Sequence, residues 1–152
     1  MQRALVVVDE TEASVELLRK AGEIAEGLGT KLYLFDTLDP EEFDDTRETL
    51  DAIGDVENTT YTDSDALETV HASLEDTVTE VFDDPGFEYE TIAAVASEGD
   101  RASTVIEAAE NHDCEQVFLS GRKRSPTGKA LFGDTVQSVL LDFDGEVTVN
   151  LQ

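Results

Sequence analysis

The chain has 152 residues, 39% of them hydrophobic, and carries 36 Asp and Glu residues against 10 Lys and Arg, for a formal net charge of -26. This size suits one domain with an ordinary core over residues 1–152, and recurring apolar runs argue against disorder. We expect a cytoplasmic protein with no membrane partner, because no apolar run reaches the ~18 residues of a membrane span and the start lacks a signal-peptide pattern.

The acidic residues are spread along the chain and do not form a single tail. Such a charge repels nucleic acid phosphates, so we expect no nucleic acid partner. It also makes the folded chain repel itself in dilute buffer, a penalty that concentrated salt removes by shortening the Debye length to ~3 Å near 1 M. We therefore interpret the charge as the adaptation of a halophilic protein to its solvent.

The first third of the chain predicts a strand, a helix and a second strand. Residues 4–8 form a valine-rich apolar run, typical of a strand buried on both faces. A helix is expected from Thr11 to the glycines at 27 and 29, followed by a strand over residues 31–35 that ends at Asp36 and Thr37. Strand, helix and strand in this order form a βαβ unit, whose handedness predicts a parallel sheet.

The middle of the chain has a weaker pattern. Residues 40–53 show some helical spacing, and the polar residues 54–64 predict a loop, so we interpret this stretch as a solvated acidic crossover. A clearer helix is expected over residues 66–82. His71 on that helix has no second ligand at metal spacing, which favours a structural role. Cys114 is the one cysteine, and we expect it to be a small buried hydrophobe.

The rest of the chain continues the alternation. Strands are expected over residues 89–95, 116–120 and 147–151, and helices over residues 102–109 and 135–143. This order predicts an open α/β sheet with helices on both faces. In such sheets ligands bind outside the carboxyl ends of the strands, where the strand order reverses. The residues at or just beyond strand ends are Asp9, Thr37, Gly99 and Ser120.

The stretch from residue 116 to 135 is the best candidate for an anion site. A strand leads through spaced glycines into a helix, an arrangement in which backbone N–H groups converge on an anion. Four of the ten basic residues lie in this stretch: Arg122, Lys123, Arg124 and Lys129. The basic cluster can equally pair with the acidic surface around it, so at this point both interpretations stay open.

With these residues in view, the whole chain resembles the universal stress protein family. The resemblance rests on the first strand ending at Asp9, on residues 97–100 before a helix, and on the strand into Ser120 and Gly121. It implies a three-layer, five-stranded parallel sheet of the nucleotide α-hydrolase-like type. It also implies a homodimer formed through the last strand, whose alternating apolar residues are Val147, Val149 and Leu151.

The ATP-binding members of that family carry Gly-x-x-Gly, nine residues, and then Gly-Ser or Gly-Thr. Here only Gly133 is kept, and Ser120, Lys123 and Asp134 occupy the other positions. Lys123 hinders a close backbone approach, although Gly121 can relax the same turn. The Asp134 carboxylate either repels a phosphate, or holds Mg²⁺ beside a nucleotide, or merely belongs to an N-cap formed by Asp134 and Thr135.

The resemblance implies an adenine near Asp9 and Thr37, with phosphates along residues 120–124 and 133–135. The alternative for Asp9 is that it caps the helix after it and does not contact an adenine. The implied nucleotide-binding residues are Val8, Asp9, Thr37, Gly99, Ser120, Gly121, Arg122, Lys123, Arg124, Gly133, Asp134 and Thr135. The expected function is a homodimeric regulatory or stress-response module that binds ATP or ADP with Mg²⁺. No nucleophile–base pair emerges, so an enzyme is not the first choice. The alternatives are a magnesium-dependent nucleotide hydrolase or phosphotransferase using Asp134 and Asp9, and a ligand-free structural dimer.

Overall fold

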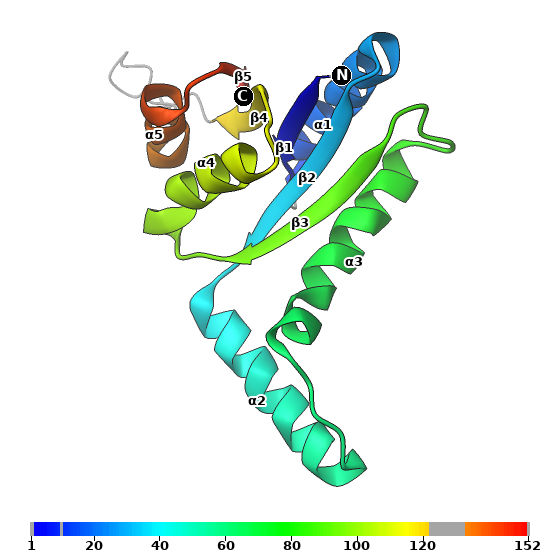
Figure 1. Ribbon diagram of the computed structural model, residues 1–152, viewed down its shortest axis with the longest axis vertical. Coiled ribbons are helices and arrows are strands. Elements are labelled where there is room, and N and C mark those ends of the chain that lie inside the picture. The colour runs from blue at the N-terminus through cyan, green and yellow to red at the C-terminus, as the bar shows by residue number, and fades with distance from the viewer. Residues whose placement is uncertain (1, 10, 122–132, 152) are drawn as a thin grey trace.

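The computed structural model describes residues 2–9, 11–121 and 133–151. Its strands form one sheet in which every neighbouring pair is parallel, in the order β3-β2-β1-β4-β5. This confirms the predicted open α/β fold (Figure 1). The strands are β1 (Arg3–Val7), β2 (Lys31–Leu38), β3 (Tyr89–Val95), β4 (Gln116–Gly121) and β5 (Glu146–Leu151).

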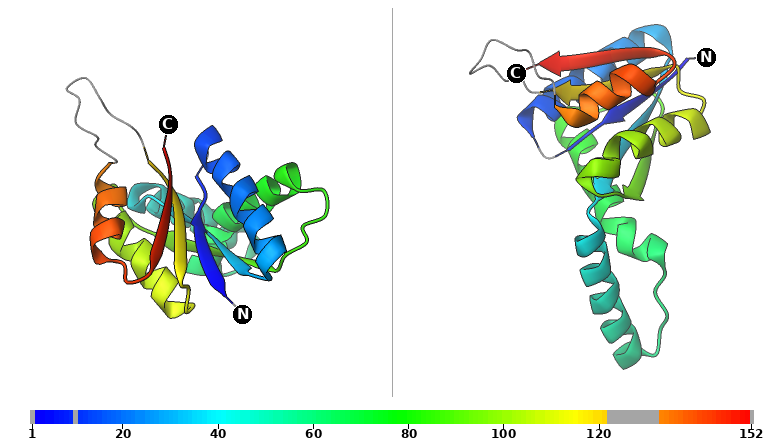
Figure 2. Two further views of the ribbon diagram at one scale, coloured as in Figure 1. Left: turned by 90° about the horizontal axis from the view of Figure 1, so that it is seen from above. Right: turned by 90° about the vertical axis from the view of Figure 1, so that its left-hand side faces the viewer.

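Helices cover both faces of the sheet, so the molecule has three layers. Figure 2 shows α1 and α3 on one side of the strands and α4 and α5 on the other. The helices are α1 (Glu12–Leu28), α2 (Pro40–Glu57), α3 (Asp63–Val81), α4 (Arg101–Asn111) and α5 (Asp134–Asp142), with a 3-10 turn, η1 (Glu98–Asp100), before α4. Among the described residues, none of these helices is long and apolar enough to cross a membrane.

Strand β1 lies at the centre of the sheet and is buried on both faces, as predicted. Successive side chains of a strand point to opposite faces. Ala4 and Val6 accordingly join the apolar cluster beneath α1 and α3, whereas Leu5 and Val7 join the cluster beneath α4 and α5. The valine-rich run therefore joins the two halves of the core.

The ends of α1 are set by local chemistry. Thr11 is the N-cap, and its hydroxyl accepts a hydrogen bond from Ser14 N. Gly29 ends the helix in the left-handed conformation, with φ 70°, which glycine adopts without a steric penalty. These caps fix where β1 and β2 connect to the helix, and the glycine cap is the one that the sequence predicts.

The predicted loop over residues 54–64 is partly wrong, because α2 continues to Glu57 and α3 begins at Asp63. The connection folds back tightly against α2. Thr59 N donates to Gly54 O at 2.8 Å, and a Cβ on Gly54 would lie 2.3 Å from Thr59 O. Gly54 is thus a helical residue at a close chain crossing and does not begin a loop.

Two single side chains take the structural roles expected of them. His71 Nδ1 lies 2.7 Å from Thr91 Oγ1 and links α3 to β3. Cys114 is buried in the apolar cluster beneath α4 and α5, and burial raises the pKa of its thiol to about 11. A thiol with so high a pKa carries little of the reactive thiolate near neutral pH.

Candidate functional site

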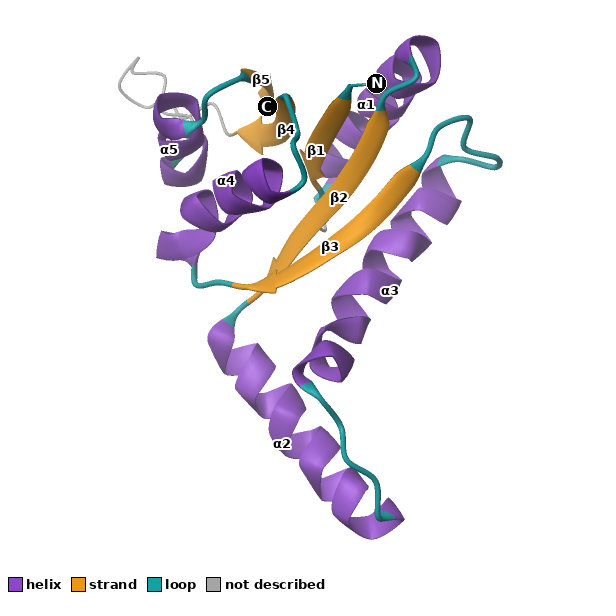
Figure 3. Ribbon diagram, in the orientation of Figure 1, coloured by secondary structure: helices purple, strands orange, loops and turns teal. Residues whose placement is uncertain are grey.

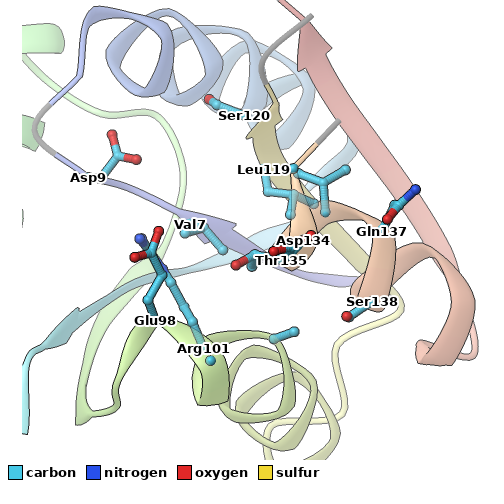
Figure 4. Close-up of a pocket in the computed structure, with 14 residues that line it drawn as sticks. Val7, Asp9, Glu98, Arg101, Leu119, Ser120, Asp134, Thr135, Gln137 and Ser138 are labelled. Carbon is cyan, nitrogen blue, oxygen red and sulfur yellow. The ribbon is translucent and has the colours of Figure 1, made fainter. Parts of the chain in front are cut away.

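A cavity of about 670 Å³ opens at the carboxyl ends of β1 and β4. The chain builds the sheet outward from β1 through β2 to β3, then returns to the other side of β1 to add β4 and β5. The cavity therefore lies where the strand order reverses, the usual ligand position in open α/β sheets. Its lining residues come from β1, β4, η1, α4 and α5 and from the residues next to them (Figure 4).

Six of the residues implied by the family resemblance line this cavity. They are Asp9, Gly99, Ser120, Gly133, Asp134 and Thr135. Val8, Thr37 and Gly121 are described but are not among the lining residues. The basic residues Arg122, Lys123 and Arg124 lie outside the described residues. The fold thus brings half of the candidate residues, from four separate segments of the chain, into one cavity lining.

Asp9 helps to shape the turn between β1 and α1. Its Oδ1 accepts a hydrogen bond from Thr11 N at 2.9 Å and another from the Thr11 hydroxyl. Its backbone N–H donates to the buried Ser14 Oγ at 2.8 Å, and that hydroxyl donates to Val7 O. Asp9 therefore braces the N-cap residue Thr11 while it lines the cavity.

Thr37 lies inside β2 and not beyond its end. It pairs with Ala94 in the sheet register, and its backbone N–H donates to Asp36 Oδ1 at 2.8 Å. The prediction that a strand ends at residue 35 was therefore too short, since β2 extends to Leu38. The extra residues keep Thr37 in the sheet, away from the cavity lining.

The start of α5 corrects one interpretation of Asp134 and Thr135. The N-cap is Gly133, with φ 91°, and Asp134 is the first residue of the helix. Asp134 therefore is not an N-cap. The positive φ explains the glycine, because L side chains rarely adopt that conformation. A carboxylate in the first turn interacts favourably with the helix dipole, so Asp134 suits the helix while it lines the cavity.

Sequence patterns did not identify Arg101, the first residue of α4. Its Nη2 lies 3.5 Å from Asp36 Oδ1, and its Nε is buried without a hydrogen-bond partner. Ser120 Oγ is also buried without a partner. In the described part of the chain three buried side-chain atoms share this condition, and two of them belong to residues that line this cavity. Buried polar atoms are nearly always paired with protein or with water, so these two atoms make Arg101 and Ser120 the candidates for contact with a bound molecule.

Other missed residues complete the walls of the cavity. Glu98 comes from η1, and Gln137 and Ser138 come from α5. Figure 4 shows Glu98 and Arg101 on one side and Gln137 and Ser138 on the other. A signal for Arg101 exists, because it is a basic residue that directly follows the predicted turn at residues 97–100. No spacing rule indicates which face of α5 lines the cavity.

The described lining carries mixed charge. It contains the carboxylates of Asp9, Glu98 and Asp134 and the guanidinium of Arg101. Such a set suits a ligand that has both hydrogen-bond donors for the carboxylates and acceptor oxygens for Arg101. Within residues 2–9, 11–121 and 133–151, no three His, Cys, Asp or Glu side chains are grouped so as to hold a metal ion.

The fold and the place of the cavity define a class: parallel α/β proteins with a ligand crevice where the strand order reverses. Within that class, the chain belongs to the universal stress protein family, whose model matches residues 1–149. The search of curated proteins found no match.

Solved structures of universal stress proteins share this fold. One from Archaeoglobus fulgidus is 23% identical with a TM-score of 0.62, and the match covers 98% of each chain. A universal stress protein in complex with cAMP is 14% identical with a TM-score of 0.64, covering 97% of this chain and 94% of that one. A universal stress protein from Archaeoglobus fulgidus in complex with dAMP is 16% identical with a TM-score of 0.61, covering 98% of this chain and 97% of that one. At these identities the likeness concerns the fold.

Proposed function

We propose that this chain is a nucleotide-binding regulatory module of a stress response, and that its ligand is an adenine nucleotide bound in the cavity between β1 and β4. The observation that carries the proposal is that two residues lining one cavity, Arg101 and Ser120, each have a buried polar atom without a partner in the protein, Arg101 Nε and Ser120 Oγ. Leaving such groups unpaired costs roughly 1–3 kcal/mol each. Acceptor oxygens on a bound ligand offset that cost.

An adenine nucleotide matches the mixed charge of the lining. Its phosphate and ribose oxygens accept hydrogen bonds from Arg101 and Ser120, and its ribose hydroxyls and adenine amine donate to the carboxylates of Asp9 and Glu98. Structural neighbours in complex with cAMP and with dAMP support the choice of nucleotide. The phosphates extend toward Gly133 and Asp134, where Asp134 and the phosphate oxygens together hold Mg²⁺ when a di- or triphosphate binds.

Calorimetric titration with ATP, ADP and AMP, each with and without Mg²⁺, tests the proposal. We expect Ser120→Ala and Arg101→Gln each to weaken binding by roughly tenfold, the effect of one lost hydrogen bond to a charged group. Ser103→Ala is the matched control for the serine, because Ser103 is exposed on α4 and its hydroxyl donates to Asp100 O. Arg19→Gln is the control for the arginine, because Arg19 is exposed on α1 and paired with Glu16.

The free protein supplies a second readout. Because the Ser120 hydroxyl has no partner without a ligand, Ser120→Ala should leave the Tm of the free protein unchanged or higher while it weakens binding. A variant that loses stability without losing affinity would assign this serine to the core. Wild-type affinity in both variants would contradict the proposed site.

We also propose that the chain forms a homodimer through β5. This strand is an edge of the sheet, where unpaired backbone groups face outward. Val147 and Val149 pack against the core, whereas Leu151 is 44% exposed at the end of the strand. Leu151 is therefore the residue of β5 whose apolar surface a partner subunit gains most by covering.

A further inference from the structure

Helix α2, the connecting residues 58–62 and the first turn of α3 form an arm that projects from the body of the molecule (Figures 1 and 3). We call this segment the α2 arm. Helix α2 is 18 residues long, yet Gly54 is its one buried residue. Val56 is 88% exposed and Ile53 is 41% exposed. A surface helix normally turns its apolar residues to the core, so these two side chains need another explanation.

The α2 arm is held together by the face of α2 that lies opposite to Ile53 and Val56. Arg47 Nη1 donates to Tyr61 O at 2.7 Å, and Arg47 Nε lies 3.5 Å from Asp63 Oδ1. Gly54 receives the returning chain at Thr59. Arg47 and Gly54 are seven residues apart, which is about two helical turns, so they lie on one face of the helix. The connection is built on this inner face, and Ile53 and Val56 take no part in these contacts.

The outer face of α2 has its own pattern. Side chains three and four residues apart share a helix face, and five exposed residues follow that spacing: Glu42, Asp45, Thr49, Ile53 and Val56. The face is thus acidic near the body and apolar near the tip. A shallow hollow of about 460 Å³ marks the apolar end, lined by Ala52, Ile53, Val56 and Glu57.

The charges of α2 indicate what covers this face. Arg47 is the single basic residue of the helix and is engaged on the inner face. The acidic residues of the helix are Glu41, Glu42, Asp44, Asp45, Glu48, Asp51, Asp55 and Glu57. A second copy of this chain docked on the same face brings further carboxylates against these, and salt screens partly buried charges in an interface much less than exposed ones. A partner that pairs apolar with cationic side chains is complementary to it.

We propose that the outer face of the α2 arm docks a cationic amphipathic helix of a partner protein. The apolar side chains of the partner cover Ile53 and Val56, and its Lys and Arg residues lie against Glu42 and Asp45. This is recognition of a helix through anchors at helical spacing, in which a few apolar residues carry most of the affinity. The proposal does not depend on nucleotide binding, because the arm and the cavity share no lining residue.

Two synthetic peptides as long as α2 test the proposal by fluorescence anisotropy. One repeats Leu and Lys in a helical amphipathic pattern, and the other has Glu in place of every Lys. We expect the Leu/Lys peptide to bind and the Leu/Glu peptide not to bind. The double variant Ile53→Ser, Val56→Ser should weaken Leu/Lys binding by roughly tenfold or more, as the loss of two buried apolar contacts predicts.

Leu141→Ser is the matched control, because Leu141 is 83% exposed on α5, away from the arm. It should leave peptide affinity within about twofold, well below the tenfold step of 1.4 kcal/mol. Equal losses in the control and in the double variant would overturn the proposal, since the peptide would then bind exposed apolar side chains wherever they lie. Wild-type binding by the double variant would overturn it as well, since the peptide would then bind the acidic surface in general. Self-association that Val56→Ser abolishes would replace the cationic partner with a second copy.

Discussion

Gly22 is the residue whose packing gives the sharpest stability test. It lies within α1, and a Cβ there would lie 2.3 Å from Phe82 Cζ. The Phe82 ring is held edge-on against Phe87, with ring centroids 5.1 Å apart. We expect Gly22→Ala to lower the free energy of unfolding by about 1–3 kcal/mol, the usual cost of overpacking a core.

Gly27, in the last turn of the same helix, provides the control. A Cβ there meets nothing within 4 Å, and alanine is a better helix former than glycine. Gly27→Ala should therefore raise the free energy of unfolding by about 0.5–1 kcal/mol. Urea titration of both variants measures the two changes. Equal effects of the same sign would show that Phe82 does not set the requirement for glycine at position 22.

Because of Cys114, we expect the free energy of unfolding to depend on pH in the alkaline range. Burial raises the pKa of this thiol to about 11 in the folded chain, above the value of about 8.5 usual for an exposed thiol. The unfolded chain loses the proton first, so folding is favoured below about pH 8.5, and this contribution falls progressively until the pH reaches the folded value. Cys114→Ala should flatten the fall in stability over that interval.

The same cysteine gives a chemical readout. Because the chain contains one cysteine, a thiol reagent reports on Cys114 alone. We expect slow labelling of the folded protein near neutral pH and fast labelling in urea. Fast labelling of the folded protein would contradict the burial of Cys114 beneath α4.

At the scale of elements, β5 carries the dimer prediction. Leu151→Asp places a charge at the exposed end of the edge strand without touching Val147 or Val149, which pack on the core. Sedimentation in molar KCl should show a dimer for the wild type and a monomer for this variant. Leu141→Asp, at an exposed position of α5, is the control and should stay dimeric. A monomeric wild type, or a dimeric Leu151→Asp, would place the interface elsewhere or remove it.

The elements that the sequence predicts well are those with strong local signals. The apolar run in β1, the helix start at Thr11 and the glycine after α1 depend on neighbouring residues alone, and the structure confirms each of them. The prediction of a loop over residues 54–64 is partly wrong. Glycine is required at position 54 because the chain at Thr59 passes close to it, and composition does not reveal this contact. In this chain, local patterns fix element types better than element ends.

The residues of the candidate site also fall into two groups, those that local sequence patterns predict and those that they do not. Strand ends place Asp9, Gly99 and Ser120 at one edge of the sheet, and the structure has all three in the cavity lining. Arg101 is missed because a buried Nε without a partner is a property of packing and not of spacing. The N-cap interpretation of Asp134 fails because the positive φ of Gly133 is set by the path of the chain. The sequence predicts where the cavity lies, but only the packed structure shows which buried polar atoms lack a hydrogen-bond partner.

At the scale of the whole molecule, charge governs stability. The formal charge of -26 on 152 residues makes the folded state repel itself wherever salt is low. Of the ion pairs found among the described residues, all include at least one side chain that is more than one-fifth exposed, so salt also screens their attraction. We expect repulsion to dominate, and Tm to rise steadily from millimolar to molar KCl. A Tm that stays constant or falls over that range would contradict the interpretation of a halophilic protein.

The central claim is that the cavity between β1 and β4 holds an adenine nucleotide. The most direct measurement is to purify the protein in molar KCl with Mg²⁺, denature it, and identify the released small molecules by mass. We predict an adenine nucleotide at close to one equivalent per chain, and a strongly reduced amount from the double variant Arg101→Gln, Ser120→Ala. A wild-type protein that releases no nucleotide, and that gives no heat when ATP, ADP or AMP is added, would contradict the claim.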